Sequence, residues 1–211
     1  MQPISKNELW HAQITLLIAI LLQLTLANSL RFGPRYLVVG LELALIFALG
    51  FTAPRRHSTA ESLHKVLSTI FIFLISVANA VQLGLLIRAL VNGTNLPGKT
   101  LLSGAIAIFL TNIIVFGLWY WELDSPGLSG RSKSKRRLNL QFPQMSSHSE
   151  DNQWKPTFFD YLYVSITNSS AFSPTDTMPM THLAKALMSA QALVSLLTVV
   201  LVTARAVNIL G

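Results

Sequence analysis

The sequence predicts an all-α, polytopic membrane protein with about five transmembrane helices plus a re-entrant pore helix, or six spans if that helix crosses completely. Hydrophobic residues make up 51% of the 211 residues and charged residues only 12%. Several apolar runs reach the roughly 20 residues that a hydrocarbon core about 30 Å thick requires of a spanning helix. This composition argues against a soluble globular domain and makes the lipid bilayer the first expected partner.

Two spans are expected first, at about residues 12–29 and 36–52, separated by a turn that contains Gly33 and Pro34. No small-residue cleavage site follows the first, so we expect it to be retained. The second carries Glu42 inside an apolar stretch, where an ionisable group is costly unless paired or hydrated. Glu42 is therefore either a functional group or, more commonly, an acid that is protonated or hydrogen-bonded to Gln23, Asn79 or Gln82 on neighbouring helices.

The third span is expected at about residues 63–90, with Ser58 or Thr59 as its cap. It carries Ser76, Asn79 and Gln82 at three-residue spacing on one side. Such polar groups more often hold helices together than line a conduit, but Asn79 and Gln82 remain, with Glu42, the intramembrane polar candidates. We expect residues 1–98 to form an N-terminal three-helix membrane region.

The next stretch, Gly93 to Thr100, fits the phosphate-binding pattern G-x-x-x-x-G-K-[ST]. That pattern requires a preceding strand and an α/β sheet to hold the nucleotide, and here it lies between two spans. We interpret it as a turn built from ordinary turn residues, so no nucleotide partner is expected.

The fourth span, at about residues 101–121, ends in an aromatic belt of the kind found at the membrane interface, Trp119, Tyr120 and Trp121. Glu122 and Asp124 follow. They are expected to be exposed loop acids, with an ion-attracting vestibule as the alternative. Residues 125–152 include the basic run RSKSKRR and should form a mobile loop near anionic headgroups, with local docking by Phe142 and Pro143.

The last part of the chain is expected to be a short helix, a turn and a long helix. Residues 158–170 have helical period but are too short and polar to cross a bilayer. The turn at 171–179 contains two prolines, and at membrane depth it survives only if protein or water surrounds it. The final helix, at about residues 182–210, carries small residues on one side, which suits close packing against another helix. These residues are Ala184, Ala186, Ser189, Ala190, Ala192 and Ser195.

From Asp160 to Ala192 this stretch resembles the pore helix, filter and inner helix of the potassium channel superfamily. The matching residues are Asp160, Leu162, Tyr163, Ser165, Asp176, Pro179, Thr181, Leu183, Ala184 and Lys185, with Ala204 and Arg205 at the end of the inner helix. The resemblance implies a channel-like pore module over residues 99–211, inorganic ions as partners and a homotetramer. The pore-helix candidates are Asp160, Tyr163, Thr167 and Asn168.

The filter departs from the family, because AFSPTD stands where the family has Thr-Val-Gly-Tyr-Gly-Asp. Glycines reach the conformations that aim carbonyl oxygens at an ion, and Pro174 fixes its φ and lacks a backbone donor. We therefore expect a pore that does not select potassium through a ladder of backbone carbonyl oxygens. Asp176 would either attract cations at the mouth or only brace the turn through a hydrogen bond. The pore and filter candidates are Ser170, Ala171, Phe172, Ser173, Pro174, Thr175 and Asp176.

The whole chain also resembles a bacterial inner-membrane protein family with a WYWELD-type motif, a FPQM segment and an AFSPTDT turn. This resemblance implies a multi-pass protein of the inner membrane and no particular activity.

Membrane orientation is in conflict with the channel resemblance. With a re-entrant pore segment, eleven of the 16 Lys and Arg residues lie on the side of the amino terminus, which the positive-inside rule makes cytoplasmic. The other five are Arg31, Arg35, Arg88, Lys99 and Arg205. The pore loop would then enter from the cytoplasm, the reverse of potassium channels. Either the pore is inverted, as in glutamate-receptor channels, or the segment from Phe158 crosses completely, or the charge rule fails.

Two functions follow. The first is an ion channel or channel-like membrane protein, cation-conducting through a filter without the potassium signature. The alternative is a non-conducting scaffold or small transporter on a channel-derived frame, with Glu42, Asn79 and Gln82 as its site. The histidines are dispersed and no cysteine is present, so we expect no enzyme, no catalytic residues, no metal and no cofactor. The net charge of +7 comes mostly from loops, so no nucleic acid is expected.

Overall fold

The computed structural model describes residues 6–24, 58–92, 97–124, 139–145, 154–171, 173 and 176–210, and this part of the chain is mostly helical. The long helices are α1 (Lys6–Leu24), α3 (Ser58–Asn92), α4 (Gly98–Asp124) and α6 (His182–Leu210). A shorter helix, α5 (Phe158–Ser170), precedes α6. Two short strands, β1 (Leu140–Gln141) and β2 (Met178–Pro179), and the 3-10 turn η3 (Pro143–Met145) lie between the helices.

Among the described residues, three helices are long and apolar enough to cross a membrane: Ser68–Asn92, Gly98–Asp124 and His182–Ala204. They coincide with the third, fourth and last spans expected from the sequence, so the coarse prediction of a helical chain with helices long and apolar enough to span a membrane is confirmed. α1 begins earlier than the first expected span, at Lys6. The second span, residues 36–52, lies outside the described residues together with Glu42.

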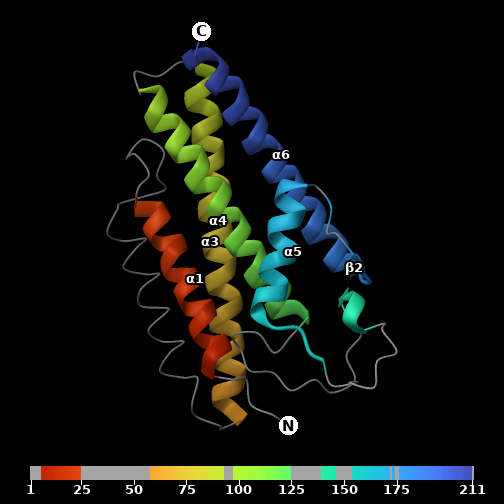
Figure 1. Cartoon of the computed structure of the whole chain (residues 1–211). Coiled ribbons are helices and arrows are strands. Elements are labelled where there is room, and N and C mark those ends of the chain that lie inside the picture. Colours follow the sequence, from red (N-terminus) through yellow and green to blue (C-terminus); the bar gives the residue numbers. More distant parts are fainter. Residues whose placement is uncertain are drawn as a thin grey trace.

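α4 is the central element of the described fold. It packs against α1 and α3 on one side and against α5 and α6 on the other (Figure 1). Its amino end is tied to the preceding turn, because the carbonyl oxygen of Pro97 accepts hydrogen bonds from the backbone nitrogens of Thr100 and Leu101. α4 therefore contacts every other long helix of the described fold, and α5 as well.

α5 and α6 begin at the same end of the molecule, beside the carboxyl end of α4. Asp124, the last residue of α4, accepts hydrogen bonds from the Tyr161 hydroxyl in the first turn of α5 and from the backbone nitrogen of Asn139. Asn139 in turn accepts a hydrogen bond from the backbone nitrogen of Met180, just before α6. The chain thus runs along α5 and returns to its starting end before α6 begins, and α5 reaches only partway along α6 (Figure 1).

The return is held by a two-stranded antiparallel ladder, in which Leu140 faces Pro179 and Gln141 faces Met178. Residues 139–145 were expected to lie in a mobile loop, and in the structure they include β1 and η3. Leu140 and Phe142 are buried, since they alternate with Gln141 along the strand and point into the core. Pro143 is exposed in η3, so of the two expected docking residues only Phe142 docks. The rest of the predicted loop lies outside the described residues.

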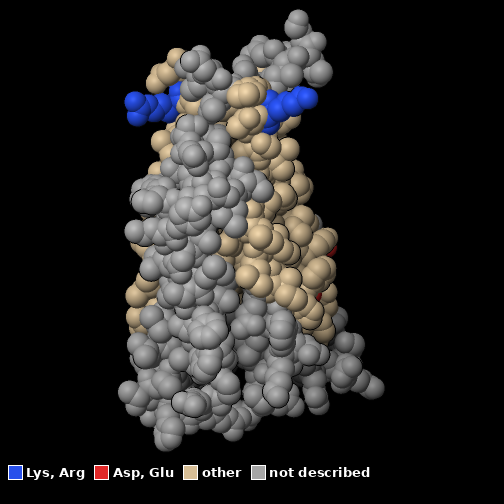
Figure 2. Space-filling model, turned by 90° about the vertical axis from the view of Figure 1, so that its left-hand side faces the viewer, with Lys and Arg blue, Asp and Glu red and all other residues tan. Residues whose placement is uncertain are grey.

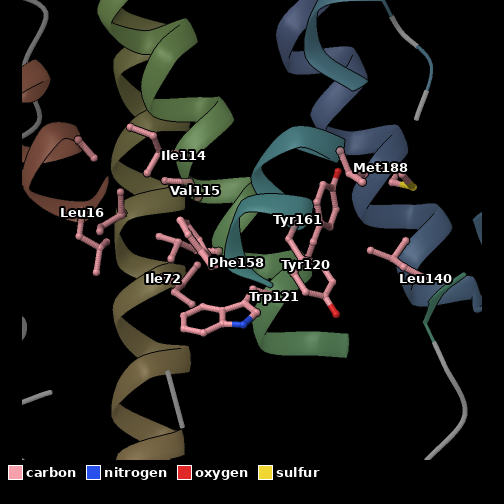
Figure 3. Close-up of a cluster of buried hydrophobic side chains, with 14 of the residues drawn as sticks. Leu16, Ile72, Ile114, Val115, Tyr120, Trp121, Leu140, Phe158, Tyr161 and Met188 are labelled. Atoms are coloured by element: carbon pink, nitrogen blue, oxygen red, sulfur yellow. The ribbon is translucent and has the colours of Figure 1, made fainter. Parts of the chain in front are cut away.

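The main core surrounds the carboxyl end of α4 (Figure 3). The Trp121 and Phe158 rings meet edge to face with centroids 5.2 Å apart, and the Phe142 and Tyr161 rings do so at 5.3 Å. Both are favourable geometries for aromatic pairs. Leu16 of α1 and Ile72 of α3 close the cluster from the other side of α4. The start of α5 is therefore fixed by apolar packing.

α4 and α5 approach closely at Gly117. A Cβ atom built at this position would lie 3.2 Å from Cδ1 and 3.3 Å from Cα of Leu162. The absence of a side chain at Gly117 is what lets the backbone of α5 lie against α4.

Candidate functional site

Seven polar side chains are buried where α4, α5 and α6 meet, in surroundings that are otherwise apolar. Each is at most 3% exposed. α4 supplies Asn112 and Tyr120, α5 supplies Ser165, Asn168 and Ser169, and α6 supplies Gln191 and Ser195. Buried polar groups are stable only when hydrogen-bonded, so their partners decide what the cluster does.

Gln191 is the centre of the cluster. Its Nε2 lies 3.0 Å from the carbonyl oxygen of Ser165, 2.6 Å from the Ser165 hydroxyl and 2.7 Å from the Ser169 hydroxyl. Its Oε1 accepts hydrogen bonds from the Tyr120 hydroxyl and from Nδ2 of Asn168, the latter at 2.9 Å. One side chain of α6 therefore binds both α5 and α4.

Ser165 and Asn168 extend this network. The Ser165 hydroxyl donates to the carbonyl oxygen of Ile113 in α4 at 2.6 Å. Asn168 Nδ2 also donates to the carbonyl oxygen of Met188 in α6 at 3.0 Å. The carboxyl half of α5 is thus joined to both of the long helices beside it.

The four predicted pore-helix residues have different surroundings. Asn168 is buried in the network just described. Asp160 caps the start of α5, since its Oδ2 accepts hydrogen bonds from the backbone nitrogen and the hydroxyl of Thr157 at 2.7 and 2.8 Å. Tyr163 is 51% exposed on the opposite face. Thr167 is half-buried and bonds back to the carbonyl oxygens of Tyr163 and Val164. The predicted set is therefore split between structural and exposed positions.

The predicted filter begins directly after the network. Ser170 ends α5 and Ala171 caps it, its backbone nitrogen donating to the carbonyl oxygen of Thr167 at 2.9 Å. Ser170, Ala171, Ser173 and Asp176 are all exposed. Phe172, Pro174 and Thr175 lie outside the described residues.

Glu122 and Asp124 correct a sequence prediction. They are only 4% and 8% exposed, so they are neither exposed loop acids nor an open vestibule. The reason is that α4 continues past Trp121 and residues 139–142 cover its end. Asp124 Oδ1 accepts hydrogen bonds from the backbone nitrogens of Asn139 and Leu140 at 2.6 and 3.3 Å, and its Oδ2 accepts from the Tyr161 hydroxyl at 3.0 Å.

The polar residues of α3 form a separate group. Ser76 joins α3 to α4, because its hydroxyl accepts a hydrogen bond from Nε1 of Trp119 at 2.9 Å. Asn79 and Gln82 are 3% and 1% exposed, and their side-chain oxygens have no partner among the described residues. Glu42, their expected companion, lies outside that part of the chain.

Charge and apolar surface are separated in the described structure. Figure 2 shows Lys and Arg side chains gathered near one end of this face, above described surface that is almost entirely uncharged. Arg88 and Lys99 are exposed at the end where α3 stops and α4 starts. α6 presents exposed Leu193, Leu197 and Val200 along its outer side. Within the described residues, no group of three acidic or histidine side chains could hold a metal ion.

Comparisons with protein-family models, with curated proteins and with solved structures found no match to this chain. The class that fold and site define is that of a helical protein with helices long and apolar enough to span a membrane and a polar junction between α4, α5 and α6.

Proposed function

We propose that the chain is one subunit of a cation-conducting membrane pore whose filter lacks the potassium signature. The observation that carries the proposal is the return of the chain after α5. A helix of 13 residues is too short to span, and it begins at the same end as the 29-residue helix that follows it. In a membrane, α5 would be a re-entrant pore helix, with α4 outside it and α6 inside.

Electrostatics and exposure support this arrangement. The carboxyl end of α5 carries the negative end of the helix dipole, which favours cations near Ser170 and Ala171. These residues and Ser173 are exposed in the single chain, and irregular backbone at membrane depth requires protein or water around it. Copies of the chain arranged around a water-filled path would supply both.

The side of α6 that faces away from the rest of the described chain supports assembly of several copies. Ala186, Ser189 and Ala190 are exposed on that side, and small side chains let membrane helices approach one another closely. One chain offers one such loop, and the channel resemblance indicates four copies around the path, hence a homotetramer in the inner membrane.

Ion flux through the purified protein in liposomes tests the proposal, with potassium, sodium and chloride gradients compared. We expect cation flux in the wild type and a lower cation flux or changed selectivity in Asp176→Asn, because a ring of exposed carboxylates raises the local cation concentration. The same substitution at Asp160, which lies in the cap at the opposite end of α5, should change selectivity less. Absence of flux under every gradient, from protein shown to be folded, would contradict the proposal.

The unpartnered side-chain oxygens of Asn79 and Gln82 favour the second candidate, a non-conducting scaffold or small transporter. Under this alternative no ionic gradient drives flux. Substitution of Gln82 by Met would then impair the protein more than substitution of Asp176 by Asn.

A further inference from the structure

We infer that Gln191 is a positioning residue that sets where the carboxyl end of α5 lies against α6, and thereby the ion selectivity of the pore. The inference rests on the proposed function for its consequence, but its structural part stands on the contacts of Gln191 alone. Among the described residues, the hydrogen bonds of Gln191 go to α4 and to residues of α5 that precede the proposed filter, so it would act through α5.

The contacts of Gln191 define the position of α5 along its own axis. Its amide reaches Ser165 and Ser169, which are one helical turn apart, and Asn168 between them. A shift of α5 by one residue along its axis would separate all three from the amide. The Tyr120 hydroxyl holds the same amide from α4, so Gln191 itself is fixed.

The nitrogen and the oxygen of the Gln191 amide also define how the amide plane is oriented. Nε2 can only donate, and it faces the oxygens of Ser165 and Ser169. Oε1 can only accept, and it faces the Asn168 amide nitrogen and the Tyr120 hydroxyl. A flipped amide would put the donors of Gln191 against those of Asn168. Because the cluster is buried, a hydrogen bond lost here is not replaced by one to bulk water.

α5 depends on this network because its other face is exposed and gains no packing from the described part of the chain. Phe159, Tyr163 and Ile166 are 69%, 51% and 40% exposed. The start of α5 is held by the aromatic core, but its carboxyl end is held by the polar network. Ser169, the last residue that Gln191 binds, directly precedes Ser170 and Ala171, where the proposed filter begins.

The first test compares the flux selectivity of Gln191→Met with that of Ser195→Ala. Met has nearly the volume of Gln and no amide, so the substitution removes the hydrogen bonds of Gln191 and little packing. Ser195 lies one turn further along α6, is equally buried, and accepts a hydrogen bond from Asn112 of α4 at 3.0 Å, with no bond to α5. We expect Gln191→Met to change the sodium-to-potassium permeability ratio by about threefold or more, the factor that corresponds to one interhelical hydrogen bond in a membrane. Ser195→Ala should leave the ratio unchanged.

The second test measures the position of α5 directly and needs no conduction. The chain has no cysteine, so Ser170→Cys and Val200→Cys, both at exposed positions, take spin labels cleanly. Pulsed electron paramagnetic resonance, on labelled chain diluted with unlabelled chain, gives the distance between the labels. Gln191→Met should broaden or shift this distance distribution, and Ser195→Ala should not.

The outcomes separate the two claims. If the wild type does not conduct and the distance still shifts in Gln191→Met, the positioning role stands and the proposed function falls. If the distance distribution is the same in all three proteins, the positioning role is overturned, whatever the flux. A shifted distance with an unchanged permeability ratio in a conducting wild type would overturn the link to selectivity.

Discussion

Asp124 ends α4 and holds two other segments against it. Its carboxylate accepts hydrogen bonds from Asn139, Leu140 and Tyr161, which come from the β1 segment and from α5. Hydrogen bonds to a charged acceptor are stronger than neutral ones, and their buried donors would find no water if the acceptor were removed. Asp124 is therefore the residue on which the junction of α4, α5 and β1 depends.

Replacing Asp124 with Ala should lower the free energy of unfolding by about 2–4 kcal/mol, because three buried donors lose their acceptor. Tyr161→Phe, which removes one of these bonds, should cost about 1 kcal/mol. Denaturant titration of the protein in detergent measures both. An Asp124→Ala protein as stable as the wild type would show that the junction does not depend on this carboxylate.

The roles of Asp124 and Gln191 were not predicted from the sequence. Asp124 looked like a loop acid because its partners lie 15 to 37 residues further along the chain. Gln191 is the one amide between residues 182 and 204 of an apolar helix, and such an amide often only joins neighbouring helices. A signal did exist: Ser165, Asn168 and Ser169 lie on one face of α5 at spacings of three and four, and such a polar stripe on a short helix requires a polar partner.

Helices with long apolar runs were predicted well, and so was the short helix α5, but the β1 segment between α4 and α5 was not. α3, α4 and α6 follow from composition and length alone. The ends of α3 and α4 differ from the expected ones because caps and tertiary cover, not hydropathy, decide where a helix stops. The β1 segment was missed because two residues of strand carry no periodic signal and exist only through pairing with β2.

The close approach of α4 and α5 predicts that a side chain at Gly117 is destabilising, and Gly84 of α3 provides the control. Gly84→Ala should stabilise α3 by about 0.5–1 kcal/mol, since nothing lies within 4 Å of the added Cβ and Ala favours helix. Gly117→Ala should be destabilising by about 1–3 kcal/mol, because the backbone of Leu162 must move. The same denaturant titration compares the two. Equal stability of both variants would mean that α5 does not rest on Gly117.

At the scale of the whole molecule, the two ends of the described fold carry separate exposed lysines. Lys99 starts α4, and Lys185 lies in the first turn of α6, beside the opposite end of α4. From the distribution of basic residues over the chain, we expect the Lys185 end to lie in the cytoplasm. The proposed pore loop would then open from the cytoplasmic side.

Single-cysteine variants test this orientation. A membrane-impermeant thiol reagent added to intact cells from which the outer membrane has been removed should label Lys99→Cys. It should label Lys185→Cys only after the cells are permeabilised. The reverse pattern would place the pore loop outside and show that the charge distribution does not set the orientation of this chain.

The central claim is that the turn after α5 lines an ion path, and one measurement tests it most directly. Ser173 is exposed in that turn, and Ser173→Cys is the only cysteine in the variant chain. A charged thiol reagent applied to liposomes should lower cation flux through Ser173→Cys severalfold, and it should leave flux through Lys99→Cys unchanged. Complete modification of Ser173→Cys, verified by mass, with no change in flux would contradict a pore at this turn.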